Sequence, residues 1–273
     1  MRLGIALPAE EAGGRPLRAE SLADAARRIE AAGFQSAWAF DAIGRRFLRP
    51  DPLTVLAVAA TATRDIELGT GVLQLPLRSP VELARRVLTT QLVCGGRLLL
   101  GVGAGSTAAD FAAVGVDFAS RFRLLDESLA RMRQLWAGGR VGDTELGPVW
   151  PVTVGGPPVL IGSWAGSRWI ERGAREFDGW VASGARSNWR LLASGIARFR
   201  HLGGARAVVT NVVVRLEADE ASPDGPDDPC DLRCPKAAAI ARLHRLRELG
   251  FDDVVLVARR HDAEHLRALC ELW

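Results

Sequence analysis

Strand and helix signals alternate along the whole chain, and this alternation restricts the available folds more than any other feature. Short runs of branched apolar residues are each followed by apolar residues at helical spacing, about eight times in 273 residues. The expected strands are 3–7, 35–40, 66–70, 97–101, 159–161, 179–182, 207–216 and 254–257. Even repetition without a break in composition favours a (β/α)8 TIM barrel, and a doubly wound open parallel sheet is the alternative.

The length suits one large α/β domain, and we expect residues 1–273 to form it. Residues 137–158 are rich in Gly and Pro and predict an irregular excursion. They are also the only candidate for a domain boundary, but they are too few to form a domain. Residues 217–235 make a polar loop rich in Pro and Asp, long enough for a mobile lid or a partly disordered segment.

Composition and charge exclude several classes of protein. An apolar fraction of 48% indicates a globular chain, and no apolar run approaches the ~18 residues that cross a bilayer. The net charge is only +3, and the arginines lie beside acidic residues, so we expect no nucleic-acid partner. The chain begins with an expected strand instead of a charged leader, which predicts a cytoplasmic protein.

The four cysteines lack the two closely spaced pairs of a zinc site, so we expect no metal and four free thiols. A local disulfide or redox role for Cys230 and Cys234 is the alternative.

The carboxyl ends of the expected strands, where barrel active sites lie, are poor in acid–base groups. All four histidines fall on expected helices: His201, His244, His261 and His265. The last two belong to an H-x-x-E-H pattern, for which a helix turn with exposed histidines is favoured over a zinc site. Asp41 is the best-placed carboxylate and the best catalytic candidate, with an Asx-turn or cap as the alternative. No G-x-S-x-G nucleophile turn is present.

The expected strand at 97–101 runs into a glycine loop that ends at Ser106. Its glycines at 101, 103 and 105 do not match the G-x-G-x-x-G dinucleotide fingerprint, because serine stands at position 106. Nearly bare backbone lets a flat or phosphorylated ligand approach main-chain N–H groups. Apolar walls with few titratable groups suit a reaction whose chemistry a flavin-type cofactor supplies.

These residues resemble the luciferase-like flavin or deazaflavin oxidoreductases, which are (β/α)8 barrels. The segments that carry the resemblance are GFQSAWAFD at 33–41, DPL at 51–53, IELGTGV at 66–72, RSP at 78–80, GGRLLLGVGAG at 95–105, GVDF at 115–118 and DGW at 178–180. Each is weak alone, whereas their order and spacing together are specific.

The resemblance implies a set of cofactor-binding residues. In the family the third strand ends in a bulge behind the flavin ring, often with a non-proline cis peptide. The segment after the fourth strand lines the ring, and the turn after the fifth binds phosphate. The corresponding residues here, together with the strand-end aspartate, are Asp41, Gly71, Val72, Gly103, Ala104, Gly105, Ser106, Gly162, Ser163, Trp164 and Gly166.

Two departures from the family's pattern limit which activities can be transferred to this chain. Many members have His where this chain has Ala42, and the sugar-phosphate dehydrogenases have Glu where it has Ser106. Sugar-phosphate oxidation is therefore not expected. The expected function is an oxidoreductase that uses coenzyme F-420 or FMN for hydride transfer to, or monooxygenation of, a small organic substrate. The alternatives are a degenerate, non-catalytic ligand-binding barrel and an NAD(P)-dependent dehydrogenase. A homodimer is expected from the resemblance alone.

Overall fold

Eight parallel strands close into a barrel in the computed structural model, which describes residues 1–11, 13–44, 46–148, 150–217 and 221–273. The barrel strands are β1 (Arg2–Ala6), β2 (Ser36–Ala39), β3 (Glu67–Thr70), β5 (Leu98–Gly103), β8 (Val159–Gly162), β9 (Gly179–Ser183), β10 (Arg206–Arg215) and β12 (Asp253–Val257). Strand β10 pairs with both β9 and β12, and this pairing closes the sheet. The expected TIM barrel is confirmed, and the open sheet is not formed.

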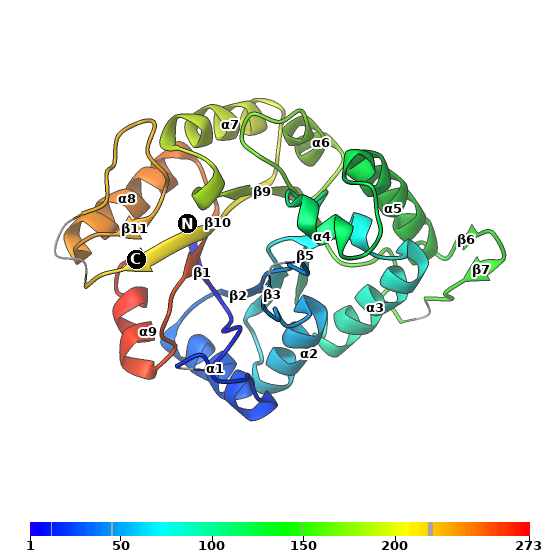
Figure 1. Cartoon of the computed structure of the whole chain (residues 1–273), viewed down its shortest axis with the longest axis horizontal. Coiled ribbons are helices and arrows are strands. Elements are labelled where there is room, and N and C mark those ends of the chain that lie inside the picture. Colours follow the sequence, from blue (N-terminus) through cyan, green and yellow to red (C-terminus); the bar gives the residue numbers. More distant parts are fainter. Residues whose placement is uncertain (12, 45, 149, 218–220) are drawn as a thin grey trace.

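Helices surround the barrel (Figure 1). They are α1 (Ala19–Ala32), α2 (Pro52–Ala62), α3 (Pro80–Val93), α5 (Arg121–Trp136), α6 (Trp169–Arg175), α7 (Trp189–His201), α8 (Lys236–Leu249) and α9 (Ala263–Cys270). Local signals set several of their ends. The Asp51 side chain accepts a hydrogen bond from the backbone N–H of Thr54 at the start of α2. Gly33 and Gly250 end α1 and α8 with left-handed φ values of 101° and 105°.

The barrel interior is filled by Trp38, which is fully buried. Its indole N–H donates to Ser36 Oγ at 2.8 Å, so its polar atom is satisfied inside the core. Neighbouring strands carry glycine where the indole lies. A Cβ on Gly69 would stand 2.5 Å from the ring, and one on Gly4 would stand 3.0 Å from its Nε1. The remaining residues of this inner cluster are Leu99, Leu160, Val181, Val208 and Val255, with Val72 packed against it.

The amino ends of the strands are joined by an ionic cluster. Asp253 is fully buried and receives two hydrogen bonds from the Arg206 guanidinium, both at 2.8 Å. Glu67 pairs with the same guanidinium at 2.7 Å and also with Arg2. A buried carboxylate requires such partners, since removal from water penalises the charged form. The cluster therefore seals the end of the barrel opposite the strand-to-helix loops.

Short elements interrupt the connections that the sequence predicts to be irregular. Helix α4 (Ala108–Ala112) follows the glycine loop after β5. The excursion 137–158 contains the hairpin of β6 (Arg140–Val141) and β7 (Thr144–Glu145). The other short elements are β4 (Leu73–Gln74), β11 (Leu232–Arg233) and the 3-10 turns η1 (Leu75–Leu77), η2 (Phe118–Ser120) and η3 (Gly184–Arg186).

Contacts hold the described part of the loop 217–235 against the barrel. Residues 218–220 of this loop lie outside the described residues. Strand β11 pairs with the end of β10. The Arg242 side chain, only 4% exposed, donates to Ser222 Oγ at 2.8 Å and to the Asp231 carbonyl at 3.0 Å. Strand pairing and Arg242 thus hold parts of the described loop against the barrel.

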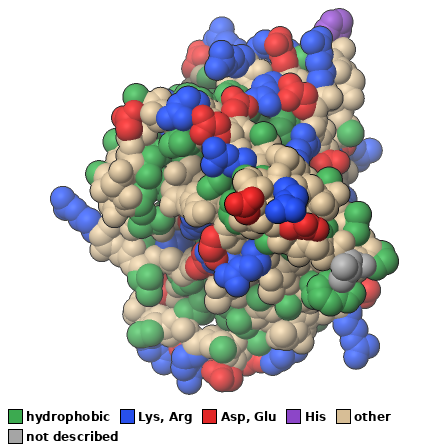
Figure 2. All heavy atoms as spheres, turned by 90° about the vertical axis from the view of Figure 1, so that its right-hand side faces the viewer, with side chains coloured by type: hydrophobic (Ala, Val, Ile, Leu, Met, Phe, Trp, Pro, Cys, Tyr) green, Lys and Arg blue, Asp and Glu red, His purple; other side chains and the backbone are tan. Residues whose placement is uncertain are grey.

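The surface carries both signs of charge. On the face shown in Figure 2, basic and acidic side chains alternate, with hydrophobic ones between them. Within the described residues, no helix is both long and apolar enough to span a bilayer. The four cysteines are free thiols, as expected: Cys94, Cys230, Cys234 and Cys270.

The glycine beside Trp38 gives a test of the packing. We expect Gly69→Ala to lower the free energy of unfolding by about 3 kcal/mol, because the new methyl group overlaps a buried indole. Gly166→Ala is the matched control, since its Cβ would meet nothing within 4 Å. Denaturant titration of both variants measures the difference, and equal losses would contradict the packing described.

Candidate active site

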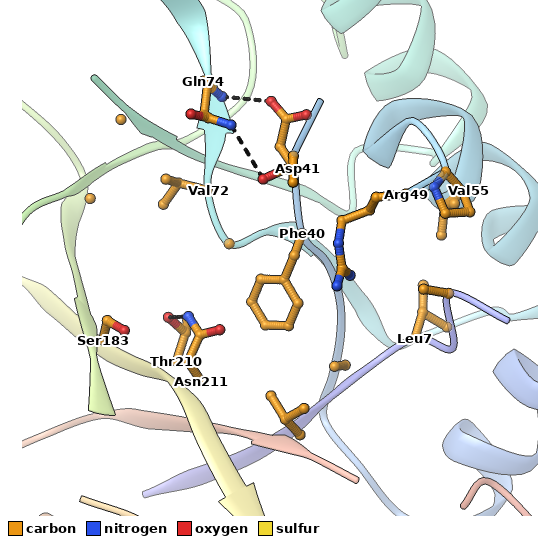
Figure 3. A pocket seen from close by; sticks show the side chains of 18 of the residues that line it. Leu7, Phe40, Asp41, Arg49, Val55, Val72, Gln74, Ser183, Thr210 and Asn211 are labelled. Atoms are coloured by element: carbon orange, nitrogen blue, oxygen red, sulfur yellow. Dashed lines mark hydrogen bonds between the residues drawn. The ribbon is translucent and has the colours of Figure 1, made fainter. Parts of the chain in front are cut away.

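A wide cleft of about 1770 Å³ opens at the carboxyl ends of the barrel strands. Residues from the ends of all eight barrel strands line it, which is where barrel enzymes carry their active sites. Figure 3 shows Leu7 on the right, Phe40 near the centre, Val72 and Gln74 on the opposite side from Leu7, and Asn211 below Val72. The volume exceeds that of an ordinary small-molecule pocket, so it can hold a cofactor and a substrate together.

Val72 forms an apolar floor between two strands. The Gly71–Val72 peptide is cis, as the resemblance leads us to expect at the end of the third strand. A Cβ on Gly103 or on Gly162 would lie 2.8 Å or 2.6 Å from the methyl groups of Val72. These two glycines therefore make room for a valine side chain, and not for a ligand alone as the sequence suggests.

The loop after β5 is fixed by Gln74. The Gln74 side-chain amide donates to the Asp41 carbonyl at 3.3 Å and to the buried Asp110 carboxylate at 3.1 Å. Its Oε1 atom is buried without a described hydrogen-bond partner and would lie 2.5 Å from a Cβ on Gly105, whose φ is +80°. Only glycine fits this position, in space and in backbone conformation. With Ala104, Gly105 gives the cleft a wall of main chain.

Asp41 is committed to an ion pair. Arg78 donates to its two carboxylate oxygens at 2.6 Å and 2.9 Å, and the backbone N–H of Gln74 donates at 2.9 Å. The Asp41 side chain is only 3% exposed, so its contact with the cleft is small. Although burial opposes the charge of Arg78, its hydrogen bond to Asp41 raises the pKa of Arg78. This bidentate pair makes Asp41 an anchor between β2 and η1.

The turn after β8 offers a hydroxyl group without a protein partner. Ser163 Oγ is buried and makes no hydrogen bond among the described residues. The backbone of Ser163 is held by Val181 O and by the indole N–H of Trp180. Trp164 is 60% exposed and lines the cleft, whereas Gly166 is not among the lining residues. A rotation of the Ser163 side chain would bring a hydroxyl donor to a ligand in the cleft.

His261 also lines the cleft, contrary to the sequence-based expectation for the histidines. It lies in the loop between β12 and α9, because Asp262 caps that helix through the backbone N–H of His265. Its Nε2 lies 2.8 Å from the carbonyl oxygen of Ala6. His265 is 9% exposed, so the expectation of exposed histidines is wrong for this turn. The sequence pattern predicts that this helix already includes His261, whereas α9 begins at Ala263.

The surroundings of the His261 imidazole favour its neutral form. Burial lowers its pKa below 6.5, although the hydrogen bond with Ala6 opposes the change. Since a carbonyl only accepts, Nε2 carries the proton of the neutral ring. No described residue bonds to Nδ1, so the ring keeps an acceptor.

Residues at the ends of β9 and β10 form the wall opposite Val72. Ser183, Thr210 and Asn211 point into the cleft there (Figure 3). The sequence around Asn211 is rich in β-branched residues and predicts a strand. It does not predict that the Asn211 side chain points into the cleft. Gln74, His261 and Asn211 are among the lining residues that the sequence-based list omits.

The residues present fit a flavin-type cofactor. The floor is apolar, the β5 wall is main chain without side-chain bulk, and Ser163 supplies an unused hydroxyl. A planar ring needs apolar faces with polar groups at its edge, and its phosphate needs donors. Of the sequence-based binding residues, the cleft brings together Asp41, Gly71, Val72, Gly103, Ala104, Gly105, Ser106, Gly162, Ser163 and Trp164.

A family model described as luciferase-like monooxygenase matches residues 1–222. The 4-hydroxyprotoasukamycin monooxygenase of Streptomyces nodosus subsp. asukaensis is 42% identical over 87 residues, which are 32% of this chain and 24% of that protein. The F-420-dependent glucose-6-phosphate dehydrogenase of Amycolatopsis mediterranei is 31% identical over 153 residues, 52% of this chain and 43% of that protein. The chain thus matches less than half the length of either relative.

Solved structures share the fold over almost the whole chain. The oxygenating constituent of 3,6-diketocamphane monooxygenase from Pseudomonas putida, a type II Baeyer–Villiger monooxygenase in complex with FMN, matches with a TM-score of 0.78 at 17% identity. The alignment covers 100% of this chain and 96% of that one. The F-420-dependent tetrahydromethanopterin reductase of Methanopyrus kandleri matches with a TM-score of 0.75 at 17% identity, over 99% and 97% of the two chains.

His261 predicts a pH dependence of stability. Because its folded-state pKa lies below the ordinary 6.5, the unfolded chain takes up a proton first as the pH falls. Stability is therefore lost as the pH falls from 6.5 towards the folded-state pKa. We expect the wild type to lose more free energy of unfolding than His261→Asn between about pH 7 and about pH 5.

Denaturant titrations at both pH values measure this difference. His201→Asn, at an exposed histidine on α7, is the control and should lose as much as the wild type. Identical pH dependence of wild type and His261→Asn would contradict a pKa of His261 lowered by its half-buried position.

Proposed function

Because this chain belongs to the luciferase-like monooxygenase family, we propose that it is an oxidoreductase that uses reduced coenzyme F-420 or FMN. The reaction is hydride transfer to, or monooxygenation of, a small organic substrate. One observation supports the proposal most strongly. The cleft combines the apolar Val72 floor, which follows β3, with the unpartnered hydroxyl of Ser163, which follows β8.

We assign the binding roles by position. Gly71 and Val72, which line the cleft, would hold the ring, together with the main chain of 103–106. Ser163 and the backbone of 162–164 would bind the phosphate, since N–H and hydroxyl donors stabilise an oxyanion. Asp41 acts through its ion pair with Arg78, which holds the segment between β3 and α3 in place.

The bound cofactor would supply the redox chemistry, as a hydride donor or as the group that activates oxygen. The chain's own contribution is to bind, to orient and to limit the access of water. The acid–base residues of the sugar-phosphate dehydrogenases are replaced by Ala42 and Ser106, so the activity of the relative from Amycolatopsis is not transferred. His261 is left as the neutral imidazole in the cleft.

The second candidate function is a barrel that binds the cofactor without turnover. Ala42, Ser106 and the fully engaged Asp41 favour it, since each removes a group that could move a proton. The two candidates differ in one measurement: only the enzyme shows reoxidation of the reduced cofactor that depends on an added substrate. Exclusive binding of NAD(P)H would favour the dehydrogenase alternative instead.

Three further features belong to the same proposal. We propose that residues 1–273 act as one domain, since the barrel closes between its first and last strands. We also propose a homodimer and a cytoplasmic location, where reduced cofactors are regenerated. A small-molecule substrate is consistent with the dimensions of the cleft.

Titration of the purified chain with FMN and with F-420 tests the binding assignment. We expect micromolar binding of at least one cofactor, and about tenfold weaker binding of it to Ser163→Ala, because a hydrogen bond to a charged group is lost. Riboflavin and the phosphate-free deazaflavin riboside should bind both forms alike. Ser194→Ala is the control, since that hydroxyl bonds within α7.

Fluorescence of the cofactor reports each titration. Failure of both cofactors to bind would contradict the proposed function. An equal loss for riboflavin and FMN in Ser163→Ala would place the phosphate elsewhere and leave the remainder of the proposal standing.

A further inference from the structure

The wall of the cleft opposite Val72 is built from neutral polar side chains of two adjacent strands. Thr210 of β10 is the register partner of Ser183 of β9, so the two side chains emerge next to each other. Asn211 follows directly, and all three line the cleft. In Figure 3 they stand together and face the space between Val72 and Phe40.

A bulge in β10 brings Asn211 to this wall. The register with β12 slips between Val209 and Val212, where one extra residue is inserted. Asn211 has a φ of 57°, in the left-handed region that Asn tolerates better than most residues. Regular alternation would turn position 211 away from the cleft. Instead Thr210 and Asn211 both line it, while Val212 packs in the outer core.

Hydrogen bonds fix the direction of the Asn211 amide. Thr210 Oγ1 donates to the Ala182 carbonyl at 3.0 Å and accepts from Asn211 Nδ2 at 3.1 Å. The Thr210 hydroxyl is thereby used as donor and acceptor. Asn211 keeps its carbonyl oxygen and one N–H, and Ser183 keeps its hydroxyl, without a described protein partner. These atoms remain accessible from the cleft, since none of them is a fully buried atom without a partner.

We propose that Ser183 and Asn211, oriented by Thr210, bind an uncharged oxygen group of the substrate, a carbonyl or a hydroxyl. The inference rests on the proposed function, which places a small organic substrate in this cleft. A carbonyl oxygen would accept from Asn211 Nδ2 and Ser183 Oγ, and a hydroxyl could also donate to Asn211 Oδ1. No charged atom belongs to the set, so it offers nothing to neutralise a carboxylate or phosphate.

The strained position argues that this amide is retained for binding. A left-handed conformation costs a non-glycine residue free energy, and such residues gather at ligand sites. Glycine would remove the cost, whereas this chain places Asn there. Thr210 is a positioning residue: its hydroxyl donates its proton to Ala182 and, as an acceptor, orients the Asn211 amide.

Selective ¹⁵N labelling of asparagine tests the proposal. The chain holds two asparagines, Asn188 and Asn211, so two side-chain amide signals are expected, and Asn211→Gly assigns them while keeping a residue that accepts positive φ. The probes are cyclohexanone, cyclohexanol and cyclohexanecarboxylate, which share one ring. Asn188 caps α7 and serves as the internal control.

We expect cyclohexanone and cyclohexanol to shift the Asn211 amide signal saturably, with Asn188 unchanged and the carboxylate without effect. Ser183→Ala and Thr210→Val should each weaken binding about fivefold, the effect of one neutral hydrogen bond. Ser194→Ala should bind as the wild type does. The dispersion of the amide spectrum reports whether each variant is folded.

Two results would overturn the proposal: no saturable shift at Asn211 with either neutral probe, or tighter binding of the carboxylate. Titration of the same samples with FMN and F-420 separates this inference from the proposed function. Cofactor binding with a silent Asn211 refutes the substrate contact alone, whereas failure of both cofactors refutes the function on which it rests.

Discussion

The packing of the Trp38 indole inside the barrel is the constraint on which the rest of the structure depends. A ring of this size fits only because β1 and β3 carry glycine beside it, at Gly4 and Gly69. The filled interior then supports Val72 from below, and the glycines of β5 and β8 let its methyl groups settle between two strands. The cleft floor is thus the top layer of the core.

Two chemically different walls rise from this floor. On one side run the bare backbone of 103–106 and the turn at Ser163, which offer N–H and hydroxyl donors. On the other stand Ser183, Thr210 and Asn211, with neutral hydrogen-bonding groups held in fixed directions. Asp41 is the carboxylate that the sequence analysis singled out, and both of its oxygens accept hydrogen bonds from Arg78. Such a cleft is suited to bind and orient, while a cofactor supplies the electrons.

The fold could be predicted from the sequence because periodicity and turn residues are local. The eight strands and the ends of α1 and α8 follow from apolar runs, Gly33 and Gly250. The candidate site was harder to predict from the sequence, since it depends on contacts between residues that are far apart in the chain. The roles of Gly103 and Gly162 were hidden because the side chain that requires them belongs to Val72, in the segment between β3 and β4. Asn211 breaks the strand alternation through a bulge, and His261 lies before a helix cap, so periodicity misplaces both.

Hydrogen–deuterium exchange of the backbone, measured with and without FMN or F-420, tests most directly whether the cofactor lies on the Val72 floor. Binding there should slow exchange at residues 103–106 and 162–164, on the two sides of Val72, and leave the β6–β7 hairpin unchanged. Cofactor binding that leaves both of those segments unprotected would contradict the location of the site.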